Sequence, residues 1–384
     1  MKKAKTGIKI DKHLFSKLII LGSLLLILIV LLLLRLSQSF CEGYSRTFVR
    51  FYFYVFGHIS STFPFSFFEL FVYGTIVYAV AFVVFFIINT KKTGIKKSYH
   101  MLLRLAIIAL SIGVTYQATA GMEYARDPVD IPLHHQLIEN PKDYREICFK
   151  FMDEFNECAA QMQYREDGSL IMPYDRTQLI ENLKKEYEKL DSDYFHSYTP
   201  TAKPMLYTGW LYRALSISGV SFAPTGEGNY NILTPDAALP FTIAHELAHA
   251  KGAMPEEDAN LVAAYICINS EDPYIRFSGF NETIWSLGSL VLATNNKQDL
   301  NDFYDMVNPN IYYNNGYEND YWEKHAVFDK ISDWFNDLYL KFNNDVGTIS
   351  YTDDIDVIHT ETEYVVHSYS RYQALYMWFY FDKN

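Results

Sequence analysis

Residues 241–265 read FTIAHELAHAKGAMPEEDANLVAAY, and this stretch indicates the fold and chemistry of the part of the chain that contains it. His245 and His249 are four residues apart, so on an α-helix their imidazoles lie on one face and can hold one metal ion. Glu246 follows the first histidine, where its carboxylate can act as general base on a water at the metal. The pattern favours a zinc-binding helix over a buried helix that contains two histidines by chance.

A catalytic zinc needs a third protein ligand and one open position. The segment 251–255, KGAMP, predicts a helix stop and restart, which lets Glu256 at the start of the next helix turn back toward the histidines. Glu257 and Asp258 are alternatives for the third ligand. Asn260 lies one helical turn after Glu256 and can hydrogen-bond a ligand histidine.

Composition narrows the function classes. The chain has 384 residues and a formal net charge of −12, which argues against a nucleic-acid partner because such proteins need a basic surface. Its four cysteines are scattered and form no CxxC pair, so a cysteine-held zinc site is not expected. Isolated thiols of this kind indicate small buried hydrophobic residues.

Long apolar runs are confined to the first third of the chain. We expect transmembrane helices near 15–36, 67–89 and 101–120, because each run approaches the roughly 20 residues that cross a bilayer. The prediction is therefore a membrane domain over 1–121 and a globular domain over 122–384, with the lipid bilayer as one partner.

Lysine placement predicts the orientation. The amino-terminal segment carries six lysines before residue 18, and TKKTGIKK at 90–97 carries four more. Under the positive-inside rule both lie in the cytoplasm, so three crossings put the globular domain outside the cell membrane. The aromatic stretch Phe48–Phe56 is interpreted as a belt at the membrane interface.

The globular half is predicted to be mainly helical with a small strand component. Apolar periodicity and capping residues predict helices at 142–162, 175–190, 256–269, 281–294 and 321–342, and a closing helix in the tail 367–381. Turn residues at 216–235 predict loops and a short strand ahead of the histidine-bearing helix.

Several segments resemble a bacterial membrane family, the domain of unknown function 3810. They are PTGEGNYN, PFTIAHELAHAKG, EEDANLVAAY followed by CINS, and NDLYLKFN. The resemblance covers most of the chain, is strongest over 203–270, and implies three membrane helices joined to an outer zincin-like metallopeptidase domain. EEDAN also resembles the signature of glutamate-ligand (gluzincin) peptidases, which implies that Glu256 binds the metal and that Asn260 supports the site. The gap between His249 and Glu256 is shorter than in better-known members.

Peptidases of this class bind substrate as an added strand beside an exposed sheet edge. GEGNYNI at 226–232 is a candidate for that edge, with Glu227 and Asn229 as substrate contacts; a plain structural turn is an equal alternative. The tail segment SYSR resembles a family SYGR pattern, which implies that Tyr369 or Arg371 stabilises the oxyanion. A core tyrosine and a surface arginine are the alternative for these two residues.

The sequence as a whole predicts a membrane-anchored zinc metallopeptidase that hydrolyses peptide bonds of a peptide or protein outside the cytoplasm. Zn²⁺ would be held by His245, His249 and Glu256, with Glu246 as the base. The alternative is a zinc-containing membrane sensor or receptor domain that binds a ligand without turnover. The sequence indicates neither the substrate nor the oligomeric state.

Overall fold

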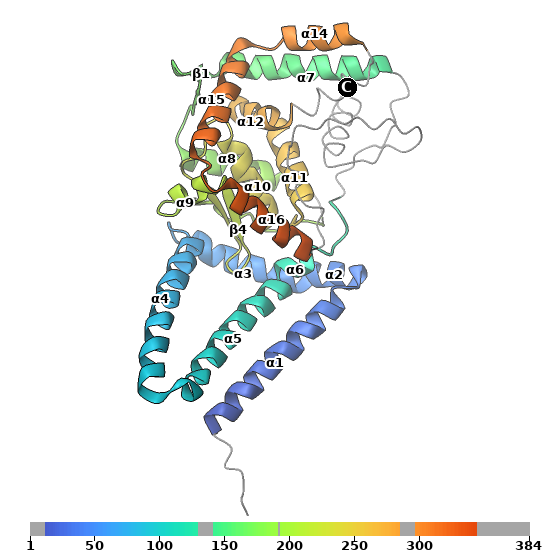
Figure 1. Ribbon diagram of the computed structural model, residues 1–384. Helices are drawn as coiled ribbons and strands as arrows, with labels where there is room; N and C mark the ends of the chain where they lie inside the picture. The colour runs from blue at the N-terminus through green and yellow to red at the C-terminus, as the bar shows by residue number, and fades with distance from the viewer. Residues whose placement is uncertain (1–11, 130–140, 191–192, 285–295, 344–384) are drawn as a thin grey trace, which may run out of the picture. The chain divides into compact units, whose positions relative to one another are not determined.

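The computed structural model describes residues 12–129, 141–190, 193–284 and 296–343 (Figure 1). These residues are mostly helical, with two small sheets. The chain divides into two compact units. Residues 1–49 and 68–126 form the first, called the membrane unit below, and residues 50–67 and 127–384 form the second, called the globular unit.

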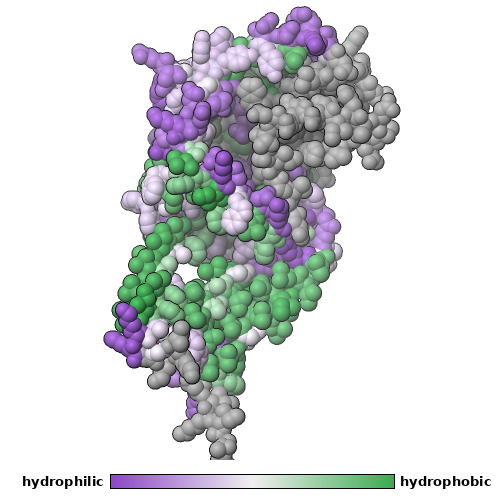
Figure 2. Space-filling view, viewed as in Figure 1, coloured by the Kyte–Doolittle hydropathy of each residue, from purple (hydrophilic) through white to green (hydrophobic). Residues whose placement is uncertain are grey.

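Three helices of the described chain are long and apolar enough to cross a membrane, and their candidate spans are Lys12–Leu34, Phe67–Lys92 and Ser98–Glu123. Figure 2 shows hydrophobic residues covering much of the surface of these helices. They confirm the three predicted spans and fit a membrane protein. The helices of this part of the chain are α1 (Lys12–Leu34), α2 (Gln38–Tyr44), a π-helix η1 (Ser45–Val49), α4 (Phe67–Thr93), α5 (Ile95–Ala118) and α6 (Ala120–Glu123).

The globular unit packs helices around a core with one three-stranded sheet. Its helices are α3 (Arg50–Ser61), α7 (Pro141–Gln161), α8 (Arg176–Glu188), α9 (Gly209–Ala214), α10 (Leu239–Ala250), α11 (Glu256–Ile268), α12 (Pro273–Thr283), α14 (Lys297–Asp305), α15 (Pro309–His325) and α16 (Asp329–Asn343). Its strands are β1 (Gln163–Tyr164), β2 (Leu170–Ile171), β3 (Lys203–Met205), β4 (Gly219–Phe222) and β5 (Glu227–Asn231).

The core lies where α10, α11 and α12 pack on one another and on α7 and α8. Phe155 on α7 packs against Phe277 and Phe280 on α12, with ring centroids 5.1 and 5.7 Å apart. Small residues such as Ala244 and Ala248 on α10 are fully buried and allow close approach of neighbouring elements. The four cysteines are free and buried, as expected of small hydrophobic residues.

The three-stranded sheet has the order β3-β5-β4, so β5 is its central strand. β5 runs parallel to β3 and antiparallel to β4, with Gly228 opposite Ser221 and Tyr230 opposite Gly219. Because side chains alternate along a strand, residues 227 and 229 face one side of the sheet and residues 228 and 230 face the other. The expectation that 226–232 forms an exposed edge is wrong, since β5 is hydrogen-bonded along both of its sides.

The membrane and globular units do not meet at a single boundary near 121. Residues 50–67, which the predicted division placed in the membrane domain, belong to the globular unit. The second crossover, between 126 and 127, lies close to the predicted one. The globular unit is therefore built from two separate segments of chain.

The single helix predicted over 321–342 is wrong. The backbone of Ala326 leaves the helical region at φ −78° and ψ 63°, and the chain divides there into α15 and α16. The amide of Phe328 then donates to the carbonyl of Ala214 at 2.7 Å, a contact between distant residues that no local pattern encodes.

The helix predicted over 281–294 begins earlier than expected. Asp272 accepts a hydrogen bond from the amide of Tyr274 at 3.0 Å and caps α12, whose first residue is Pro273. Residues 285–295 and the predicted tail helix at 367–381 lie outside the described residues.

Candidate metal centre

The α10–α11 hairpin brings three candidate ligands to one point. α10 ends at Ala250, and Gly252 has a φ of +99°, a conformation that glycine adopts without steric cost. Pro255 precedes α11, whose first residue is Glu256. The predicted stop and restart are confirmed, and the tight turn returns the Glu256 carboxylate to the two histidines.

His245, His249 and Glu256 each offer a ligand atom, and these atoms all lie within 4.8 Å of one another. The Glu256 carboxylate lies 3.2 Å from Nε2 of His245 and 3.6 Å from Nε2 of His249. Two ligands of a tetrahedral zinc stand about 3.3 Å apart, given metal–ligand bonds of about 2.0–2.1 Å. The donor set and its spacing therefore fit a zinc ion with three protein ligands.

Hydrogen bonds orient both imidazoles. The Nδ1 of His249 lies 2.9 Å from the carbonyl oxygen of Ala253, so this nitrogen donates and Nε2 keeps its lone pair for the site. The Asn260 side chain lies near the His245 ring and contributes to raising its pKa. Outer hydrogen bonds of this kind fix the tautomer and raise the basicity of metal-binding histidines.

Charge in the cluster favours an ionised Glu256. Burial alone would raise the pKa of Glu256, but the two histidines outweigh it and lower the pKa to about 2. Burial likewise opposes charge on His245, yet the hydrogen bond and charge of Glu256 raise its pKa to about 9. Burial lowers the pKa of His249 to about 4, which leaves that ring neutral. An anionic carboxylate and a neutral imidazole are the forms that bind metal, so Glu256 and His249 already have that form and His245 would lose its proton when a metal binds.

Glu246 lies beside the cluster and is buried. Burial raises the pKa of its carboxyl to about 8, against the opposing charge of His245. Its Oε2 atom has no hydrogen-bond partner among the described residues. Buried carboxylates are normally paired, so an orphaned oxygen next to three convergent ligands is the feature expected of a group that acts on a ligand.

Two glycines that sequence reasoning missed make room for Glu246. A Cβ at Gly219 on β4 would stand 2.3 Å from Oε1 of Glu246. A Cβ at Gly228 on β5 would stand 2.9 Å from the backbone carbonyl carbon of the same residue. A side chain at either position would displace part of Glu246, so the sheet packs directly against this residue.

The other two acidic residues of the EED segment take no part in the cluster. Asp258 is buried, and its carboxylate accepts a hydrogen bond from the amide of Val129 at 3.2 Å. Glu257 is half-buried and is not among the grouped ligand atoms of the described chain. The geometry thus favours Glu256 among the three alternatives.

Glu227 and Asn229 are buried and share one face of β5. Glu227 accepts a hydrogen bond from the amide of Phe67 at 3.1 Å, and Asn229 accepts one from Ser66 Oγ at 2.6 Å. Their side chains hold the chain that leads into α4 and lie on the sheet face opposite Gly228, which abuts Glu246.

The family model described as "Protein of unknown function (DUF3810)" matches residues 44–358, which is most of the chain. The chain belongs to this family. No curated protein and no solved structure matches this DUF3810 member. The matched region contains the whole candidate metal centre and the segments on which the resemblance was based.

The two residues predicted to stabilise the oxyanion, Tyr369 and Arg371, lie outside the described residues and outside the region matched by the family model.

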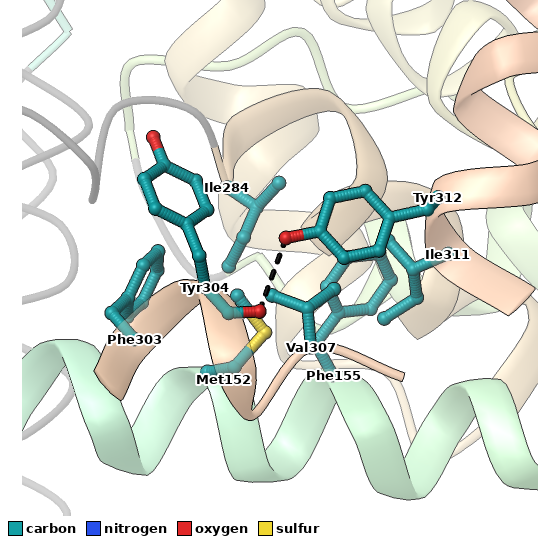
Figure 3. Close-up of a pocket in the computed structure, with 8 residues that line it drawn as sticks. All are labelled: Met152, Phe155, Ile284, Phe303, Tyr304, Val307, Ile311 and Tyr312. Carbon is teal, nitrogen blue, oxygen red and sulfur yellow. Dashed lines mark hydrogen bonds between the residues drawn. The ribbon is translucent and has the colours of Figure 1, made fainter. Parts of the chain in front are cut away.

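An apolar cavity lies between α7, α14 and α15 (Figure 3). Tyr312 Oη donates across it to the carbonyl of Tyr304 at 3.1 Å. Its lining is Met152, Phe155, Ile284, Phe303, Tyr304, Val307, Ile311 and Tyr312, and it contains no candidate ligand.

Proposed function

We propose that this DUF3810 member is a membrane-anchored zinc metallopeptidase with a zincin-like domain that cleaves peptide bonds outside the cytoplasm. One observation carries the proposal: the ligand atoms of His245, His249 and Glu256 converge within 4.8 Å beside a buried Glu246 whose Oε2 lacks a partner in the described chain. Three protein ligands with an adjacent base match a catalytic site better than a structural one, which is normally closed by four ligands.

The two histidines and Glu256 would hold the zinc ion. Bound there, zinc would supply a Lewis acid that lowers the pKa of a water molecule and polarises a carbonyl group. Glu246 would accept a proton from the attacking water and deliver it to the departing amine nitrogen. Asn260 and the Ala253 carbonyl would keep the two imidazoles in the required orientation.

β4 is the sheet edge that best suits a peptide substrate. Among the described residues β4 pairs with β5 alone, and its first residue, Gly219, abuts the Glu246 carboxylate. A substrate added as a strand along the other side of β4 would run past the base and the ligands. This assignment replaces β5 as the proposed edge and takes the substrate role from Glu227 and Asn229.

The proposed orientation rests on lysine placement. Lysines at the amino terminus and at positions 91, 92, 96 and 97 favour a cytoplasmic location for both segments. With three spans, the globular unit then lies on the outer side of the cell membrane.

The second candidate function is a zinc-containing sensor or receptor domain. A binding site has no use for a base, so the buried carboxylate of Glu246 favours catalysis.

A single substitution distinguishes the proposed peptidase function from the proposed sensor function. Purified full-length protein, loaded with zinc, would be incubated with a diverse peptide library and its products identified by mass spectrometry. Glu246→Gln should lower turnover by about 100-fold or more, the usual contribution of a general base, while zinc content stays near one per chain. Glu257→Gln is the matched control and should keep both. Cleavage unaffected by Glu246→Gln, or a wild type that binds zinc but cleaves nothing, would overturn the peptidase.

A further inference from the structure

α3 is connected at both ends to membrane-crossing helices. On one side α2 and η1 lead back to α1 with few residues between them, and on the other side α4 begins at Phe67, six residues after α3 ends. The candidate span of α4 also begins at Phe67. The chain therefore leaves one span and re-enters the next through α3, although α3 itself belongs to the globular unit.

α3 carries large apolar side chains on its outward face as well as on its buried one. Its buried positions, Phe53, Gly57 and Ser60, recur with helical spacing. On the outward face Phe51 is 66% exposed, Ile59 50% and Tyr54 48%, and His58 is the polar residue among them. A surface helix of a water-soluble domain keeps polar residues on the face opposite its core.

The inner face of α3 is fitted to the globular unit. The ring of Phe53 stacks on His196 with centroids 4.9 Å apart. Gly57 allows close approach, since a Cβ there would lie 3.2 Å from the ring of Tyr198. Tyr52 Oη donates to the carbonyl of Pro224 at 2.8 Å. These contacts determine which face of α3 points outward.

The corner that follows α3, residues 62–67, is also bonded to the globular unit. Lys203 Nζ donates to the carbonyl of Phe63, Asn229 accepts from Ser66, and Glu227 accepts from the amide of Phe67. Lys203, Glu227 and Asn229 are all buried on one face of the sheet. This corner carries two further exposed aromatic side chains, Phe63 and Phe65.

We propose that the outward face of α3 and the following corner lie in the headgroup–acyl boundary of the bilayer, and that lipid is their partner. The face consists of the exposed residues Phe51, Tyr54, Ile59, Phe63 and Phe65, with His58 among them. Aromatic side chains concentrate at this boundary, and a helix with one apolar face lies in its plane. A water-facing location would leave a contiguous apolar patch exposed, which soluble surfaces avoid. The inference depends on the membrane spans and not on the proposed catalysis.

Spin labels can measure the depth of this face in the full-length protein reconstituted in phosphatidylcholine nanodiscs. The variants are Phe51→Cys and Ile59→Cys, and Tyr313→Cys on α15, 64% exposed, is the matched control. The native cysteines are buried, and unsubstituted protein measures any background labelling. Accessibility to oxygen and to a water-soluble nickel chelate would be compared by power-saturation electron paramagnetic resonance.

The labels at 51 and 59 should be several-fold more accessible to oxygen than the control label and correspondingly protected from nickel. Accessibility equal to that of the control would place the face in water and overturn the proposal. Protection from both reagents would indicate a protein partner and would also overturn it. Zinc content and turnover affect neither result, so the outcome is separate from that of the peptidase experiment.

Discussion

Buried charge has different surroundings in two regions of the globular unit. At the metal centre, Glu246 is buried with Oε2 unpaired among the described residues, and the ligand atoms around it converge on one point. At the corner that follows α3, buried Lys203, Glu227 and Asn229 each bond a group on residues 63–67. The comparison teaches that polar residues in a buried strand do not by themselves mark a binding site. At the candidate metal centre an unpaired carboxylate oxygen coincides with converging ligand atoms, whereas at the corner the polar groups bond one another and the backbone.

The largest expected effect is a loss of zinc affinity on substitution of Glu256, which its neighbour Asp258 on α11 should not share. Glu256→Ala should weaken zinc affinity by more than about 100-fold, because loss of outer hydrogen-bond partners alone costs about 10–100-fold. Asp258→Asn, the control, should keep zinc because its carboxylate bonds the Val129 amide. Zinc affinity would be measured by competition with a chromogenic chelator on the full chain. Equal affinity in both variants would remove Glu256 from the ligand set.

A smaller effect is expected where the sheet meets the base. Gly219→Ala places a methyl group 2.3 Å from where Oε1 of Glu246 now lies, so the carboxylate must move. Displacement of a reacting group by about 1 Å can cost as much as about 100-fold in turnover. We expect kcat to fall with zinc content unchanged, and Gly316→Ala, which has open space around it, to match the wild type. Unaltered kcat in Gly219→Ala would show that this contact does not position the base.

The smallest catalytic effect is expected at the α3 corner. Glu227→Ala leaves the part-buried amide of Phe67 without its acceptor and the buried Lys203 without a nearby carboxylate, which should lower the free energy of unfolding by about 1–3 kcal/mol. Thermal unfolding in nanodiscs would report the loss, while zinc affinity and turnover per folded molecule stay near wild type. A selective loss of turnover at full stability would return Glu227 to the substrate site and break the comparison.

The parts of this molecule that follow local patterns could be predicted. Three apolar runs predicted three candidate spans, and the spacing of His245, His249 and Glu256 predicted a cluster that the fold does form. The helix predicted to begin at 175 is capped by Asp175, whose side chain accepts a hydrogen bond from the amide of Gln178 at 2.9 Å. Each of these features depends on residues only a few positions apart.

Features that depend on distant residues were missed. Residues 50–67 read as a membrane-side segment, since their partners in the globular unit lie about 140–170 positions away, as with Ser61 and Thr201. The close approach of Gly219 and Gly228 to Glu246 depends on the register in which β4 and β5 pair beside α10. β5 is the central strand because β3, which begins at residue 203, pairs with its second side.

The position of the three-stranded sheet has a consequence for the side from which a substrate would arrive. Glu227 and Asn229 face the α3 corner, while Gly228 faces α10, so the sheet stands between that corner and the helix that carries His245 and His249. On the two proposals above, the peptide bond would be cut on the side of the sheet that faces away from the lipid.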